Sequence, residues 1–324
     1  MRSAPCAMRY GGTGMQILIS GSLAYDRIMD FPGKFSDHIL ADKIHILNVC
    51  FVVNGLTEKF GGTAGNIAYS LALLGEKPLI LATAGNDFGQ YEAWLRQHDL
   101  PLDGIRLISE ELTAGAYITT DMGDNQITGF NPGAMKYPSL YEVDQAGVPE
   151  KLAIIAPGNV EDMVSYSLAY KKHKIPYIFD PGQQITSLSA DQLTDLVSGS
   201  NLLIANDYEL ELITEKTGLK RNALLERTEA IIVTLGENGS IIIAARDETK
   251  IGIAKPSRVL DPTGAGDAYR AGLIKGLVLG KELAQAASMG ATCASYAIEH
   301  QGTQEHAFTL DGFWTRYRQN FGLE

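Results

Sequence analysis

Residues 261–272 read DPTGAGDAYRAG and are the most informative stretch of the chain. Gly264, Ala265 and Gly266 are small residues at the expected start of a helix, where backbone N–H groups can approach an anion and the helix N-terminus adds positive partial charge. Asp267 then falls in the first turn, beside that anion site. A carboxylate would normally repel a phosphate there, so its presence is explained if it accepts the proton of a hydroxyl that attacks a γ-phosphoryl group. The alternative is an Asp cap in a glycine turn, which is common.

Outward from this stretch, short apolar segments alternate with helical ones. The expected strands are QILISGSLAYD (16–26), PLILATAG (78–85), KLAIIAPG (151–158), IPYIFDPG (175–182), NLLIAND (201–207) and AIIVTLG (230–236). GGTAGNIAYSLALLG (61–75) is typical of a glycine turn that leads into a helix ending at Gly75, and residues 267–300 are expected to be helical. This alternation predicts an α/β fold whose sheet is mostly parallel and covered on both faces.

Two segments break the alternation. Residues 42–55 (DKIHILNVCFVVNG) and 113–130 (TAGAYITTDMGDNQITGF) are rich in β-branched residues and have no helix between strands. The second contains MGDN at 122–125, which suits a hairpin turn. Both are interpreted as strands of a small sheet that forms a lid; the alternative is that they are edge strands of the main sheet.

Composition excludes several classes of protein. The 324 residues carry a formal net charge of −11 and contain no basic run, which argues against a nucleic-acid partner. No apolar run reaches the roughly 18–20 residues of a membrane span, so no membrane partner is expected. The three cysteines form no CxxC pair, which favours a reducing, cytoplasmic location. Residues 1–14 lack any pattern and are expected to be a disordered tail, with Met15 as a natural start and the functional domain over 15–324.

Five motifs in order resemble those of the ribokinase-like (PfkB) carbohydrate kinases. They are DPTGAGD with its downstream AG, GGTAGNIAYSLALLG, AGNDFG (84–89), NDYE (206–209) and VTLGENGS (233–240). No GxxxxGK[ST] motif is present, so the chain is not a P-loop kinase. The resemblance implies a ribokinase-like fold: a mostly parallel, Rossmann-like sheet flanked by helices, with a small β-sheet lid near residues 27–58 and 113–133.

The resemblance also implies where ATP and Mg²⁺ bind. Glu209 matches the glutamate that organises Mg²⁺ and its waters, and Asn206 would contact phosphate or the same waters. The alternative for Glu209 is a carboxylate on an acidic surface face of a helix. Thr234, Gly236 and Gly239 would line the nucleotide; a tight turn is the alternative for these three. In relatives the region of Asp261 lies near a monovalent-cation site, so Asp261 either supports such an ion or braces the turn.

For the acceptor, the resemblance implies that Asp26, at the end of the first strand, holds vicinal sugar hydroxyls; a turn carboxylate is the alternative. Gly61, Gly62 and Asn66 would shape the sugar site, although Asn66 also suits a helix-start side chain that bonds its own backbone. His38, Phe130 and Asn131 fall in the expected lid, where they would meet the base of a nucleoside or close over its sugar; packing is the alternative.

Within the family, the segments GSLAYDRIM (21–29), DHIL (37–40), ITTDMGDNQITGFNPGAM (118–135) and FDPGQ (179–183) resemble microbial nucleoside kinases of the adenosine kinase type. The implied reaction is ATP-dependent phosphorylation of a nucleoside 5′-hydroxyl, with Asp267 as the base. Two alternatives stay open: a sugar kinase acting on ribose or a related sugar, and a non-catalytic ligand-binding relative. A homodimer is compatible with the sequence but not specified by it.

Overall fold

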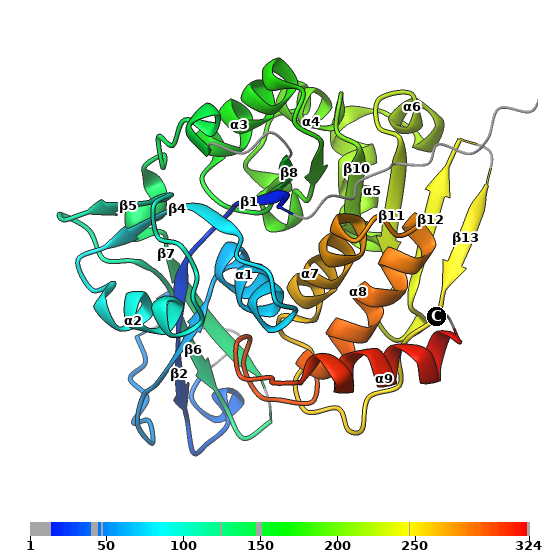
Figure 1. Cartoon of the computed structure of the whole chain (residues 1–324). Coiled ribbons are helices and arrows are strands. Elements are labelled where there is room, and N and C mark those ends of the chain that lie inside the picture. The colour runs from blue at the N-terminus through cyan, green and yellow to red at the C-terminus, as the bar shows by residue number, and fades with distance from the viewer. Residues whose placement is uncertain are drawn as a thin grey trace, which may run out of the picture.

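The computed structural model describes residues 14–39, 45–46, 48–123, 125–146, 151–245 and 247–322. Residues 1–13 of the expected tail therefore lie outside the described residues. The described chain folds around one large sheet, with a small sheet beside it at the lower left of Figure 1.

The large sheet has nine strands in the order β13-β12-β11-β10-β9-β8-β1-β4-β5. Every pair from β11 to β5 is parallel, whereas β12 pairs antiparallel with β11 and with β13. The strands are β1 (Gln16–Ser20), β4 (Leu79–Gly85), β5 (Ile105–Ile108), β8 (Lys151–Ile155), β9 (Tyr177–Phe179), β10 (Leu202–Asn206), β11 (Ala230–Thr234), β12 (Ser240–Ala244) and β13 (Glu248–Ile251). The predicted parallel sheet is confirmed.

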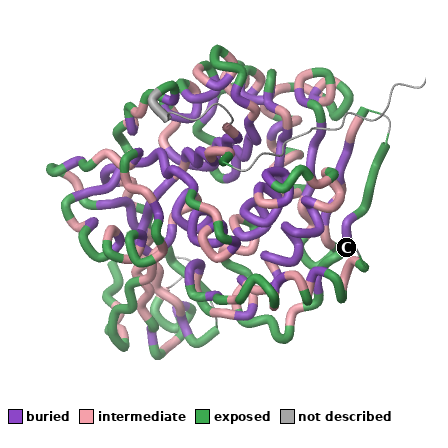
Figure 2. The backbone as a smooth tube through the Cα atoms, in the orientation of Figure 1, coloured by how far each residue is buried: buried purple, intermediate pink, exposed green. Residues whose placement is uncertain are grey.

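Both faces of this sheet are buried under helices, as the runs of apolar residues in its strands require. In β1, Ile17 and Ile19 join one core cluster with α1, α2, α7 and α8, while Leu18 joins a second cluster with α3, α4 and α5 on the opposite face. The helices are α1 (Thr63–Leu73), α2 (Gly89–Gln97), α3 (Val160–His173), α4 (Ala190–Val197), α5 (Asp207–Thr217), α6 (Arg221–Leu225), α7 (Ala265–Val278), α8 (Leu283–Ala297) and α9 (Leu310–Phe321). Figure 2 shows the buried strands at the centre of the molecule.

The small sheet has the order β3-β2-β6-β7, with bounds Thr57–Gly61, Ala24–Asp30, Ala114–Thr120 and Gln126–Asn131. The β6–β7 pair is the antiparallel hairpin predicted at 113–130. Residues Gln126 to Phe130 of β7 are exposed, and β7 is an edge strand of this sheet. That the small sheet moves as a lid stays a prediction.

Two expectations about strands are wrong. Among the described residues of 42–55, positions 45–46 are in a helical turn and 48–55 contain no strand. Phe51 packs against Phe31 and Phe35. The β-branched residues Ile46, Val49 and Val52 are exposed and have no described strand to pack beside. Asp26 also does not lie at the end of the first strand. The chain leaves β1 at Ser20 and enters the small sheet, so Asp26 is the third residue of β2.

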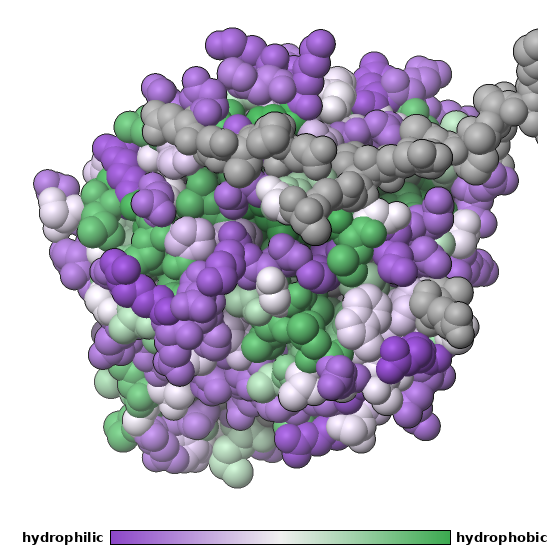
Figure 3. Space-filling model, in the orientation of Figure 1, coloured by the Kyte–Doolittle hydropathy of each residue, from purple (hydrophilic) through white to green (hydrophobic). Residues whose placement is uncertain are grey.

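Polar residues cover most of the face seen in Figure 3, with smaller hydrophobic areas among them. Within the described ranges, no helix has the length and apolar character needed to cross a membrane. The described cysteines are free thiols: Cys50 is exposed and Cys293 is buried.

Candidate active site

Two cavities meet at the N-terminus of α7. One has a volume of about 480 Å³ and the other of about 520 Å³. Five residues line both of them: Thr63, Pro157, Gln183, Gly264 and Asp267. Asp267 is therefore reached from two sides, which is the position required of a group between a phosphoryl donor and its acceptor.

The first cavity lies at the carboxyl ends of β9, β10 and β11, where ligands bind in open α/β sheets. It is lined by Asp180 and Gly182 after β9, by Asn206–Glu209 at the end of β10 and the start of α5, and by Thr234 and Gly236 at the end of β11. Gly266 and Arg270 of α7 complete it. A helix N-terminus, backbone turns and an arginine together favour an anionic ligand such as a phosphate chain.

The N-terminus of α7 leaves backbone donors for such an anion. Gly264 precedes the helix with φ of 78°, a left-handed conformation that favours glycine. Ala265 N donates to Pro262 O at 3.2 Å, so Ala265 belongs to the turn. Gly266 and Asp267 follow at positions where helical N–H groups have no intrahelical acceptor, which makes them the candidate anion donors.

The second cavity lies between α1 and the small sheet. Its polar side chains include Ser22, Asp26, Asn66 and Thr303, and its apolar ones include Phe130 and Met135. This combination suits a ligand with hydroxyl groups at one end and a flat apolar surface at the other.

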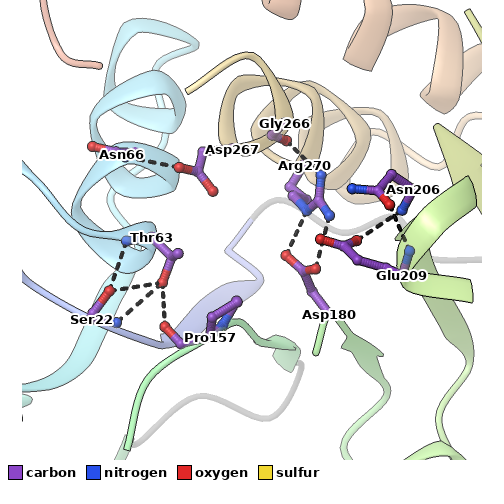
Figure 4. A network of polar contacts seen from close by, with 10 residues as sticks. All are labelled: Ser22, Thr63, Asn66, Pro157, Asp180, Asn206, Glu209, Gly266, Asp267 and Arg270. Atoms are coloured by element: carbon purple, nitrogen blue, oxygen red, sulfur yellow. Dashed lines mark hydrogen bonds and ion pairs between the residues drawn. The ribbon is translucent and has the colours of Figure 1, made fainter. Parts of the chain in front are cut away.

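Asp267 has the environment of a general base. Burial raises the pKa of its carboxyl to about 6, against the opposing effects of a hydrogen bond from Asn66 and the nearby charge of Arg270. Asn66 Nδ2 donates to Asp267 Oδ2 at 2.8 Å, as Figure 4 shows. A base with a pKa near the operating pH is deprotonated yet still able to take a proton.

Asn66 is itself held by neighbours. Gln304 Nε2 donates to Asn66 Oδ1 at 3.0 Å and to the Tyr91 hydroxyl at 2.6 Å, and Trp94 Nε1 donates to Gln304 Oε1 at 2.9 Å. These bonds fix which end of the Asn66 amide faces Asp267. Asn66 thus lines the second cavity and orients the carboxylate of Asp267; its contact with a sugar stays a prediction.

Asp26 lines the second cavity, and Gly61 leaves space for its side chain. A Cβ on Gly61 would stand 2.7 Å from Asp26 Oδ2, and a Cβ on Gly62 would stand 2.6 Å from Ser22 O. Burial, and secondarily the charge of Asp261, raises the pKa of Asp26 to about 6. Packing therefore leaves no space for a side chain at Gly61 or Gly62, and Gly62 also lines the second cavity.

The sequence and the fold of this chain are similar to those of known proteins. Residues 37–309 match the pfkB family carbohydrate kinase. The chain belongs to this family. A nucleoside kinase of Methanocaldococcus jannaschii is 32% identical over 304 residues, which span 93% of this chain and 96% of that protein.

Solved structures agree with the family. A Burkholderia thailandensis nucleoside kinase in complex with inosine is 36% identical, with a TM-score of 0.85 over 95% of this chain and 99% of that one. The same kinase in complex with ADP-inosine is 36% identical, with a TM-score of 0.83 over 95% and 97% of the two chains. The ribokinase-like fold predicted from the motifs is confirmed.

The NDYE element of this pfkB family member has a structural role besides any ligand contact. Glu209 N donates to Asn206 Oδ1 at 2.7 Å, and Asn206 N donates to Glu209 Oε2 at 2.8 Å, so the two side chains form a capping box on α5. Both also line the first cavity. Burial raises the pKa of Glu209. Of its two oxygens, Oε1 has the freedom to face a ligand.

Of the other residues predicted around the nucleotide, two line the first cavity and two support the backbone near it. Thr234 and Gly236 line the first cavity. Gly239, with φ of 81°, is not among its lining residues, and a Cβ there would stand 2.1 Å from Ile251 O. Asp261 accepts backbone N–H groups from Thr263 at 2.9 Å and Gly302 at 3.0 Å, which supports a bracing role.

The lid residues also divide. Phe130 lines the second cavity. Asn131 is not among the residues that line it, and its side-chain oxygen accepts a hydrogen bond from Gly133 N at 3.1 Å within the same turn. His38 packs edge-on against Phe31 and Phe51, which favours packing over ligand contact.

Sequence reasoning missed the buried pair Asp180–Arg270 and the support from Gln304. Arg270 lies within the DAYRAG stretch and Asp180 within FDPGQ, so both belong to motifs that resemble those of kinases. Their partnership joins positions 90 apart and has no local signal. Gln304 lies outside every motif.

Proposed function

We propose that this pfkB family kinase is an ATP-dependent nucleoside kinase that phosphorylates the 5′-hydroxyl of a nucleoside. The observation that carries the proposal is the meeting of an anion-binding cavity and a hydroxyl-binding cavity at Asp267. The relatives support it, because the Burkholderia enzyme was solved with inosine and with ADP-inosine.

In the proposed mechanism, the acceptor hydroxyl lies against Asp267 and the γ-phosphoryl lies against the N-terminus of α7. The acceptor oxygen forms a bond to the γ-phosphorus as the bond from that phosphorus to the β–γ bridging oxygen breaks. The bridging electron pair leaves with ADP, and the hydroxyl proton passes to Asp267. The N–H groups of Gly266 and Asp267 stabilise the charge on the transferring group.

The residues present fit a magnesium ion in the first cavity. Mg²⁺ is usually held through one or two carboxylates, substrate phosphates and several waters. Glu209 offers one such carboxylate, while among the described residues no cluster of three or more His, Cys, Asp or Glu side chains is placed to hold a metal. The ion would neutralise phosphate charge there. A monovalent cation near Asp261 remains part of the proposal, because each carboxylate oxygen accepts one N–H group and keeps a further lone pair for an ion.

The second cavity, in which the acceptor would bind and which is called the acceptor cavity from here on, favours a nucleoside over free ribose. Asp26 can accept two hydroxyl hydrogen bonds from a ribose diol. Phe130 and Met135 add apolar surface that a nucleobase would cover and a bare sugar would not. The free thiols of Cys50 and Cys293 support a cytoplasmic location.

The test is an assay of ATP-dependent phosphorylation on a panel of purine and pyrimidine nucleosides, ribose and fructose. The proposal expects the highest kcat/KM with a nucleoside. A higher kcat/KM with ribose or fructose would favour the sugar-kinase alternative. No turnover of any acceptor, combined with measurable nucleoside binding, would favour a ligand-binding protein.

A further inference from the structure

Arg270 is a buried cation that lines the first cavity, and neither the motifs nor the proposed mechanism give it a role. It lies one helical turn after Gly266 and Asp267 on α7, and it lines the same cavity as they do. Residues three apart on a helix share a face. Figure 4 shows its guanidinium between Asp267 on one side and Asn206 with Glu209 on the other.

Asp180 holds this guanidinium by one edge. Arg270 Nε donates to Asp180 Oδ2 at 2.6 Å and Nη2 donates to Asp180 Oδ1 at 2.8 Å. The side chains are only 8% and 3% exposed, respectively. A two-point contact of this kind fixes the plane of the guanidinium as well as its position.

The third nitrogen is held by the backbone. Arg270 Nη1 donates to Gly266 O at 3.1 Å. A guanidinium has five N–H bonds, and these contacts use one on each nitrogen. Among the described residues, no further partner of Arg270 accounts for the second N–H of Nη1 or of Nη2. Those two bonds form the end-on edge of the guanidinium, a fork that matches two oxygens of a phosphoryl group.

The glycine in the motif supports this placement. A Cβ on Gly266 would stand 2.9 Å from Arg270 Nη1, so a larger residue there would push against a guanidinium that Asp180 already holds. Gly266 therefore does more than expose its own N–H: it leaves room for the arginine beside the anion site.

The charge of Arg270 is permanent at this site. Burial opposes the charge, but the carboxylate of Asp180 and its hydrogen bonds outweigh burial and raise the pKa of Arg270. The pair is close to neutral before ligand binds, which lowers the cost of burying the arginine.

From this geometry we propose that Arg270 is a catalytic residue that contacts the transferring phosphoryl group through its end-on N–H pair, and that Asp180 is the positioning residue that aims it. The inference rests on the proposed kinase function and extends it. Charge on the phosphoryl oxygens and their distance from the leaving oxygen change during transfer, so a fixed arginine can bind the transition state more tightly than ATP.

The test compares three variants with the wild type. R270K keeps the charge but cannot present a planar fork. The double variant D180N/R270Q replaces the ion pair by two neutral amides that can still hydrogen-bond, so no unpaired charge is left buried if a single variant fails to fold. R318Q, at an exposed position in the last turn of α9, is the matched control.

For D180N/R270Q we expect kcat to fall by about 10²–10³-fold, the usual effect of removing a donor to developing charge. R270K should show a smaller loss, and R318Q none. The more specific measurement is calorimetric binding of ADP alone and of ADP with aluminium fluoride, an analogue of the transferring group, in magnesium buffer. The wild type should bind the fluoride complex much more tightly than ADP, and the double variant should lose this gain while keeping its ADP affinity.

Two results would overturn the role of Arg270. One is a folded double variant whose kcat stays within a few-fold of the wild type. The other is an equal loss of affinity for ADP and for the aluminium fluoride complex, which would place the arginine on the ADP phosphates. Turnover of nucleosides by the wild type in the same assay tests the proposed function separately, so the two failures are distinguishable.

Discussion

Asn66 Nδ2 lies 2.8 Å from Asp267 Oδ2, although the two residues are 201 positions apart in the chain. Asn66 lies in the first turn of α1, after the glycine turn, and Asp267 lies in the first turn of α7, after the second glycine motif. Their hydrogen bond joins the two motifs into one site. It also places the carboxylate for proton transfer, because Gln304 fixes the orientation of the Asn66 amide.

Asn66→Ala should lower kcat by on the order of 10²-fold, because a base out of alignment loses most of its benefit. The lost hydrogen bond normally lowers the pKa of Asp267, so its removal should also move the acidic limb of the pH–rate profile to higher pH. Steady-state kinetics across pH would measure both effects.

The exposed residue Asn222 in α6 provides the matched control, Asn222→Ala. A purely substrate-binding role for Asn66 predicts a different result: a raised acceptor KM with an unchanged kcat and an unchanged acidic limb.

The pH dependence of the wild type follows from the same carboxyl group. The pKa of Asp267 is raised to about 6, and only the deprotonated form can accept a proton. kcat should therefore be level near neutral pH and fall as pH decreases through about 6. A limb near pH 4, the ordinary range of an aspartate, would contradict the buried environment of the base.

Asp26→Asn should mainly weaken acceptor binding. Losing hydrogen bonds that sugar hydroxyls donate to a charged group costs about 1.5–3 kcal/mol. The sharper measurement compares a ribonucleoside with its 2′- and 3′-deoxy analogues by calorimetry. The wild type should discriminate against the analogues, and the variant should lose much of that discrimination. Equal discrimination by both proteins would remove Asp26 from the diol site.

Phe130→Ala tests whether the apolar end of the acceptor cavity holds a nucleobase. Phe130 lines that cavity and is 53% exposed, so a bound base would cover part of its ring. Stacking on an aromatic ring contributes about 0.5–1.5 kcal/mol beyond area burial. The acceptor KM should rise for a nucleoside and stay unchanged for free ribose. The same rise for both would indicate a general effect on the small sheet.

The sequence predicted the large sheet because apolar strands and amphipathic helices carry local periodic signals. It also predicted the glycine turns, where a positive φ at Gly62 and Gly264 limits the choice of residue. The strand expected within 42–55 was wrong because β-branched composition does not specify a strand without a neighbouring strand to pack beside. Among the described residues of this segment, Ile46, Val49 and Val52 are exposed instead.

Contacts between site residues that are distant in sequence could not be predicted from local sequence patterns. Nothing near Asp180 indicates that its carboxylate holds Arg270, and nothing near Gln304 indicates that it orients Asn66. Glu209 shows a related limit. The NDYE pattern suits a metal ligand and a capping box equally, and the structure shows the capping box directly.

The central claim is that Asp267 takes the proton of the acceptor hydroxyl. Asp267→Asn keeps the size of the side chain and can still accept from Asn66, but it cannot take a proton at neutral pH. Asp311→Asn, at an exposed position in α9, is the control. The decisive measurement is kcat of Asp267→Asn together with calorimetric affinities for ATP and nucleoside. We expect kcat to fall by about 10²–10⁴-fold with both affinities nearly unchanged; a kcat within a few-fold of the wild type would reduce Asp267 to a helix-start residue and contradict the mechanism.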